Sequence, residues 1–89
     1  MRNNEIRTVY HPGVYLSEYL EEMHINQNEF AIKLGINEKQ VSLILKGKTN
    51  ITSDIAKKLS MVIGTSSNYW LNLQAIYDEY LDSKEKTSV

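Results

Sequence analysis

The sequence contains no cysteine, a single proline and four glycines among its 89 residues. Without cysteine the chain has no disulfide bonds, no thiolate nucleophile and no cysteine ligands for zinc, and this composition is typical of a protein in a reducing compartment. No apolar run approaches the roughly 20 residues that a membrane-spanning helix needs, and the first residues lack the apolar segment of a secretory signal. The sequence therefore predicts a cytoplasmic protein with no membrane partner.

The chain also has few of the residue patterns that catalysis requires. His11 and His24 are its only histidines, and neither belongs to a metal-binding spacing such as HExxH. There is no glycine-rich phosphate loop, and no spacing of serine, histidine and aspartate suggests a catalytic triad. The length allows one small domain and not a catalytic domain beside a regulatory one. We therefore expect no enzymatic activity, no catalytic residue, no cofactor and no metal site.

Glycines and potential capping side chains divide the sequence into five segments. In each segment apolar residues recur at the three- or four-residue spacing of a helix, and no segment alternates for long enough to predict a strand. The pattern predicts an all-α fold of five helices, at about 13–23, 27–34, 38–46, 53–63 and 67–82.

Residues 27–46, QNEFAIKLGINEKQVSLILK, contain two of these helices joined by a very short connection. Such helices cross steeply and need a small residue at their contact. Ala31 is that small residue and Gly35 makes the turn, while Val41 and Ile44 anchor the second helix. This spacing is typical of a helix-turn-helix, whose second helix lies in the major groove of DNA. A helical hairpin that only packs against the domain would need the same small residues, so the exposed face of the second helix decides between the two interpretations.

That exposed face carries side chains that suit DNA. Lys39 has the reach for guanine O6/N7 or a phosphate, Ser42 for a base edge or a phosphate, and Leu43 for a thymine methyl. Gln40 has two possible roles, capping its own helix or bonding adenine, and we favour the cap. Glu38 either accepts a hydrogen bond from cytosine or only favours its helix N-terminus, and we favour the second role.

The distribution of charge supports a DNA-binding interpretation, although the net charge of −1 argues against it. Residues 1–32 carry −3 and residues 59–89 carry −2, whereas residues 33–58 carry +4. A charge run is usually only a solvated face. Here the positive block coincides with the second helix of the pair and with Lys46 and Lys48 after it, which favours contact with phosphates.

The last predicted helix carries more apolar surface than one domain of this size buries. Over residues 69–81 the apolar side chains spread well beyond the single stripe that one packed face needs. A second copy of the chain would cover the remainder. We assign Trp70 to the core, and Tyr77, Tyr80 and Leu81 to a dimer interface. Deep burial of the whole helix within one domain is the alternative.

Tyr15 and Tyr19 lie one turn apart on the first predicted helix. Such a pair usually only fills the core, and we favour that interpretation. Together with Glu18, Glu21 and Glu22, the pair alternatively offers an acidic, aromatic face to a basic partner.

Further motifs surround the helix-turn-helix and make the sequence resemble a known family. With residues 27–46 it resembles the Xre-type (lambda-repressor-like) helix-turn-helix proteins and, more narrowly, the HigA-type antitoxins of toxin–antitoxin pairs. The resemblance covers about residues 11–80. The motifs that carry it are HPG at 11–13, KGK at 46–48, IT at 51–52, GTS at 64–66 and YWLNLQ at 69–74.

The resemblance implies a five-helix homodimer that binds palindromic operator DNA, represses its own operon and neutralises a small basic toxin, usually a ribosome-dependent ribonuclease. It also implies roles for single residues. Gln27 matches a phosphate-contacting position, and Glu38 departs from many relatives, which have a neutral or basic residue there. The base-reading positions are Glu38, Lys39, Ser42 and Leu43, and the backbone-contacting ones are Lys46 and Lys48.

The resulting domain organisation places one helix-turn-helix domain, including the C-terminal dimerisation helix, at residues 11–82. Residues 1–10 form a polar N-terminal segment that could order on a toxin, and residues 83–89 form a flexible tail. Two alternatives stay open on the sequence. One is a phage- or plasmid-type repressor without a toxin partner, and the other is a partner-sequestering module that does not bind DNA.

Overall fold

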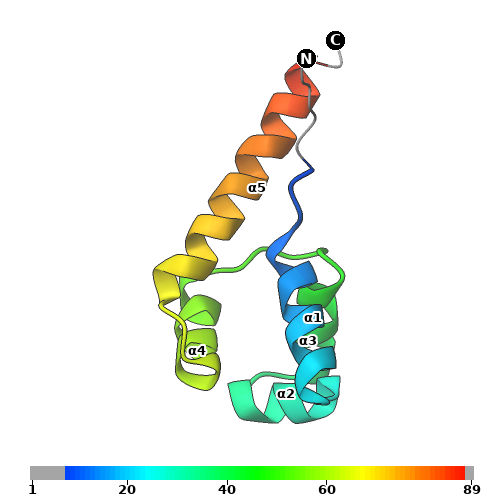
Figure 1. Cartoon of the computed structure of the whole chain (residues 1–89), viewed down its shortest axis with the longest axis vertical. Coiled ribbons are helices and arrows are strands. Elements are labelled where there is room, and N and C mark those ends of the chain that lie inside the picture. The colour runs from blue at the N-terminus through cyan, green and yellow to red at the C-terminus, as the bar shows by residue number, and fades with distance from the viewer. Residues whose placement is uncertain (1–7, 88–89) are drawn as a thin grey trace.

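Five α-helices and no strand form the part of the chain that the structure, a computed structural model, describes: residues 8–87. The all-α prediction is confirmed. The helices are α1 (Pro12–Met23), α2 (Gln27–Leu34), α3 (Glu38–Leu45), α4 (Ser53–Ile63) and α5 (Ser67–Thr87). The first four gather at one end and α5 extends away from them, which gives a molecule of 45 × 24 × 23 Å (Figure 1). Residues 1–7 of the expected N-terminal segment and 88–89 of the expected tail lie outside the described residues.

Each helix begins after a residue whose side chain accepts a hydrogen bond from a backbone N–H of the first turn, which satisfies a group that has no helical partner. At α2 the bond is reciprocal, because the Glu29 carboxylate also accepts from the Asn26 N–H at 3.0 Å. These caps confirm the predicted starts of α2 to α5, and the cap of α1 is a histidine. The capping residues are His11, Asn26, Asn37, Thr52 and Ser66.

Two helix ends differ from the prediction. α3 ends at Leu45, and Lys46 is its C-cap instead of its last residue. α5 does not end at about Asp82 but continues to Thr87, so most of the expected flexible tail is helical. The residues after Asp82 include Lys and Glu, which have high helix propensity and therefore favour continuation of the helix.

The hydrophobic core lies between the four packed helices and the first turns of α5. Trp70 is 4% exposed, which confirms its assignment to the core. Ala31, at the crossing of α2 and α3, is buried as predicted. The buried apolar side chains are Leu16, Leu20, Phe30, Ala31, Leu34, Val41, Ile44, Ile51, Ile55, Ala56, Leu59 and Trp70.

Candidate nucleic-acid interface

The turn between α2 and α3 has the geometry that the sequence predicts. Gly35 adopts a left-handed conformation with φ of 76°, and its N–H donates to the Ala31 carbonyl at 2.8 Å. The Ile36 N–H donates to the same carbonyl at 3.1 Å, and the Ile36 side chain packs against the core. The Asn37 side chain then caps α3 by accepting from the Gln40 N–H at 2.7 Å. The helix-turn-helix therefore occupies the segment 27–45.

α1 packs closely against the buried side of α3. Gly13, in the first turn of α1, lies so close to the Ile44 carbonyl oxygen that a Cβ at this position would clash with that backbone atom. Only glycine allows this approach without moving one of the two helices. The buried side of α3, with Val41 and Ile44, thus faces α1 and the core, and the opposite side faces solvent.

The solvent-facing side of α3 carries the residues predicted to read DNA. Lys39 and Gln40 are exposed, Leu43 is 38% exposed and Ser42 is half-buried. Gln27, the first residue of α2, is also half-buried. None of these side chains is fully buried, and those of α3 lie on the face of that helix opposite Val41 and Ile44.

Two side chains of α3 behave differently from one another. The preferred capping role of Gln40 is wrong for its side chain, because only its backbone N–H takes part in the cap and α3 lacks the reciprocal bond seen at α2. The Gln40 amide is therefore available to a base. The Glu38 carboxylate lies in the first turn of α3 and accepts a hydrogen bond from the Asn28 amide at 3.4 Å. This contact ties Glu38 to α2, and its role at the helix N-terminus stays a prediction.

The loop after α3 presents two more lysines. Gly47, with φ of 72°, lets the chain close a Schellman motif in which its own N–H donates to the Ile44 carbonyl at 3.0 Å and the Lys48 N–H to the Leu43 carbonyl at 2.8 Å. Lys46 and Lys48 therefore project from a backbone with fixed geometry, and both side chains are exposed.

Three lysines at this surface have no ion-pair partner among the side chains that the structure describes, residues 8–84. Within that range an ion pair joins Lys58 to Asp54 on α4 at 3.3 Å, and no carboxylate comes within the same reach of Lys39, Lys46 or Lys48. A cation without an intramolecular partner is free to replace the counterions of a phosphate. The positive segment of the sequence thus forms an exposed cationic surface on α3 and the loop after it, here called the α3 surface.

Two buried polar side chains, whose roles the sequence analysis missed, fix the loop that carries Lys48. Gln74 of α5 is 5% exposed, and its Oε1 accepts from the Ile51 N–H at 2.7 Å. Its Nε2 donates to Asn50 Oδ1 at 3.3 Å and to Asp78 Oδ1 at 3.0 Å. Gln74 thus ties the loop between α3 and α4 to the long helix α5.

His11 makes the second connection to this loop. Its Nδ1 accepts from the Gly13 N–H at 2.8 Å and its Nε2 pairs with the Thr49 carbonyl at 3.0 Å, which requires the neutral tautomer with the proton on Nε2. Burial lowers the pKa of His11, while the bond to Thr49 and the charge of Asp78 oppose this effect less strongly. The ring also meets Tyr77 of α5 edge-on, with centroids 5.2 Å apart. His11 belongs to the HPG motif and Gln74 to the YWLNLQ motif of the family pattern. These motifs are the feature of the sequence that marks both residues as important.

α5 extends away from the other helices (Figure 1), and the predicted dimerisation residues belong to positions 77–81 of this helix. Tyr77 and Tyr80 are half-buried with ring centroids 6.5 Å apart, and Lys84 Nζ lies 5.7 Å from the centre of the Tyr80 ring. Leu81 is 43% exposed and Ile76 51% exposed. The far part of α5 therefore presents apolar side chains that its own chain leaves open to solvent.

Two further kinds of site have no candidate in the described part of the chain. None of its helices combines the length and the apolar character that crossing a bilayer requires. Across residues 8–87, no three His, Asp or Glu side chains converge as they would to hold a metal ion.

Comparison with known proteins agrees with this geometry. A family model described as helix-turn-helix matches residues 16–70. YddM of Escherichia coli strain K12, an uncharacterized HTH-type transcriptional regulator, is 41% identical over 76 residues, which cover 85% of this chain and 79% of that protein.

Solved structures of the same fold include two HigA proteins. An addiction-module antidote protein of the HigA family from Coxiella burnetii has a TM-score of 0.88 at 35% identity, covering 92% of this chain and 90% of that one. The Pseudomonas aeruginosa antitoxin HigA, solved with the higBA promoter, has a TM-score of 0.86 at 28% identity, covering 91% and 89%. The chain therefore belongs to the Xre-type helix-turn-helix family that includes the HigA antitoxins.

Proposed function

We propose that this protein is the antitoxin of a type II toxin–antitoxin pair. As a homodimer it binds a palindromic operator, represses its own operon and neutralises a ribonuclease toxin. The observation that carries the DNA-binding part is the α3 surface, where Lys39 on α3 and Lys46 and Lys48 just after it are exposed and have no ion-pair partner among the described side chains. The HigA antitoxin solved with its promoter supports the same assignment.

In this mechanism each protomer inserts α3 into the major groove of one half-site. Lys39, Gln40 and Leu43 face the base edges, while Lys46 and Lys48 neutralise phosphates on either side of the groove. The two copies of α3 in the dimer lie about 34 Å apart, one turn of DNA, so that both read the same face of a palindrome. Pairing through Tyr77, Tyr80 and Leu81 of α5 sets this distance.

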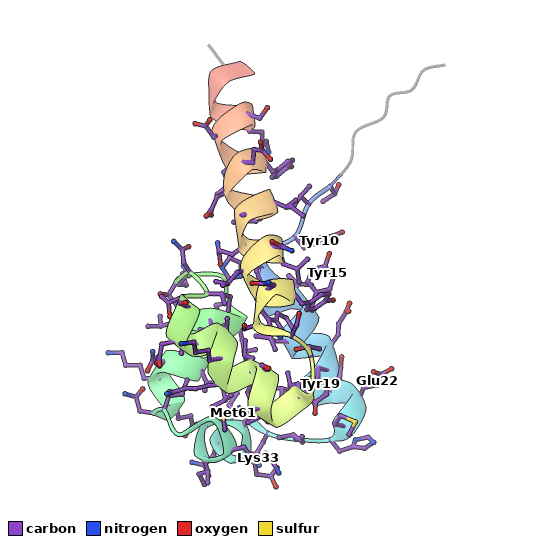
Figure 2. The ribbon with its side chains drawn as sticks, turned by 90° about the vertical axis from the view of Figure 1, so that its left-hand side faces the viewer. Tyr10, Tyr15, Tyr19, Glu22, Lys33 and Met61 are labelled. Carbon is purple, nitrogen blue, oxygen red and sulfur yellow. The ribbon has the colours of Figure 1, made fainter. Side chains whose placement is uncertain are left out.

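A gel-shift assay with the promoter upstream of the gene tests DNA binding. Lys39→Ala should weaken operator binding by about 1–3 kcal/mol and relax the preference at one base position, because this side chain faces base edges. Lys48→Ala should weaken binding to all sequences alike and reduce the salt dependence by about one phosphate contact. Lys33→Ala, which removes the same charge from an exposed site on α2, is the matched control (Figure 2).

The outcomes separate the two roles. Equal binding by Lys39→Ala and the control would remove Lys39 from the base-reading set, and a loss confined to one base position would contradict the phosphate role of Lys48. If the wild-type protein does not shift the promoter at all, the partner-sequestering module replaces the repressor.

Co-expression with the product of the adjacent gene tests the toxin part. We expect a small basic protein that arrests growth when it is expressed alone and that co-purifies with this chain when the two are expressed together. An adjacent product that neither arrests growth nor co-purifies would leave a repressor without a toxin partner.

A further inference from the structure

A groove of about 270 Å³ opens between α1 and the junction of α4 with α5. Figure 2 shows Tyr15, Tyr19 and Glu22 following one another along the side of α1 that borders it. The groove shares no residue with the α3 surface or with the dimerisation residues of α5. Its aromatic and acidic lining residues are Tyr15, Glu18, Tyr19, Glu22, Tyr69 and Trp70.

The aromatic walls of the groove are held in place by contacts within the chain. The Trp70 indole N–H donates to Thr65 Oγ1 at 2.6 Å, and the Tyr69 ring meets the Trp70 ring edge-on with centroids 5.0 Å apart. On the α1 side the Tyr19 ring leans against buried Phe30, at 6.4 Å between centroids. Tyr15 and Tyr69 nevertheless remain 37% and 46% exposed. The groove therefore presents ring faces that are already oriented and open to a ligand.

The acidic residues of the groove have no counter-charge among the side chains that the structure describes. Glu18 and Glu22 are exposed and lie one turn apart on α1, a spacing at which like charges repel each other. In the described part of the chain no Lys, Arg or His comes within ion-pair distance of either carboxylate. Ring faces beside these carboxylates attract a cation, because the π-face of an aromatic ring has a negative electrostatic potential and each carboxylate carries a negative charge.

We propose that this groove is the docking site for a Lys or Arg side chain that projects from a basic partner protein. The proposal rests on the proposed function, in which that partner is the toxin. An arginine suits the lining best, because its planar guanidinium stacks on tyrosine while its N–H groups donate to carboxylates. The groove and the α3 surface share no residue, so the partner and DNA do not compete for the same side chains.

The charge requirement is tested with two neighbouring glutamates. Glu22 lines the groove, whereas Glu21 is equally exposed on α1 but does not line it. Affinity is measured by calorimetric titration with the purified basic product of the adjacent gene. We expect Glu22→Lys to bind at least about tenfold more weakly, because the new lysine repels the cationic side chain of the partner. Glu21→Lys changes the net charge equally and should stay close to wild type. Equal affinities of the two variants, both with wild-type circular dichroism, would overturn the proposal.

A second measurement tests the groove without the toxin. Trp70 is the only tryptophan of the chain and lines the groove, so its indole N–H resonance reports occupancy. N-acetyl-arginine amide should shift this resonance saturably in the wild type and not in Glu22→Lys. N-acetyl-citrulline amide, which has the same shape without the charge, should not shift it.

The two arms distinguish failure of the groove from failure of the proposed function. Saturable binding of the arginine probe without binding of the adjacent gene product supports the groove as a site for a cationic side chain. It excludes that gene product as the partner. Binding of that product with no discrimination between arginine and citrulline, and none between the glutamate variants, overturns the groove and leaves the antitoxin assignment standing.

Discussion

Replacing Gln74 with Met tests whether this one side chain supports the loop between α3 and α4. Methionine has a similar length and keeps the buried contacts of the stem, but its thioether sulfur is only a weak acceptor and does not replace the amide oxygen that accepts from the Ile51 N–H. Because that N–H lies among buried residues, leaving it unpaired costs about 1–3 kcal/mol. For a domain of this size about 2 kcal/mol corresponds to a melting temperature lower by roughly 8–16 °C.

The assay for Gln74→Met is thermal and urea unfolding followed by far-ultraviolet circular dichroism. One fixed protein concentration is used, because the dimer that we propose would make the midpoint depend on concentration. Gln40→Met makes the same chemical change at an exposed position and should lie within about 0.5 kcal/mol of wild type. If Gln74→Met is as stable as Gln40→Met, the loop does not depend on this hydrogen bond and the reasoning is refuted.

Three further predictions follow from the contacts of α1 and α5. Gly13→Ala should lower the free energy of unfolding by about 1–3 kcal/mol, since its Cβ would meet the Ile44 carbonyl; urea unfolding checks this, and wild-type stability would mean that α1 can move away from α3. The lowered pKa of His11 means that the unfolded chain takes up a proton there more readily, so stability should fall as the pH drops below about 6.5. His11→Asn should remove this part of the pH dependence between about pH 7.5 and 5.5, and an unchanged slope would exclude His11 as its source. Tyr80→Asp together with Leu81→Asp should give monomers in light scattering and lose operator affinity, whereas an unchanged dimer would place the interface elsewhere.

The sequence predicts those parts of the fold that depend on neighbouring residues. Asn26, Asn37 and Thr52 each cap a helix through a backbone N–H three positions on, and that pattern is readable without a structure. The periodicity of α3 likewise separates its buried side from its exposed side. The end of α5 differs from the prediction because apolar periodicity stops near Asp82, whereas helix propensity continues the helix to Thr87.

Contacts between distant segments had no such signal. Gln74 reaches Ile51 from the long helix α5, and the His11 ring reaches Thr49 across most of the domain, so neither pairing follows from spacing along the chain. The groove also forms between segments that are distant in the sequence. The spacing of Tyr15 and Tyr19 along one helix groups them with three glutamates. The fold adds Tyr69 and Trp70 from α5 to this group and leaves Glu21 outside the groove.

The connection of the α3–α4 loop to α5 has a consequence for the choice of operator. His11 and Gln74 fasten that loop to the helix that we propose pairs with the second protomer, so each α3 has little freedom to swing independently. In such a dimer the distance and the angle between the two copies of α3 are fixed. One extra base pair between half-sites rotates one of them by about 35° around the DNA axis, given about 10–10.5 base pairs per turn. The protein should therefore reject operators whose half-sites are correct in sequence but wrongly spaced.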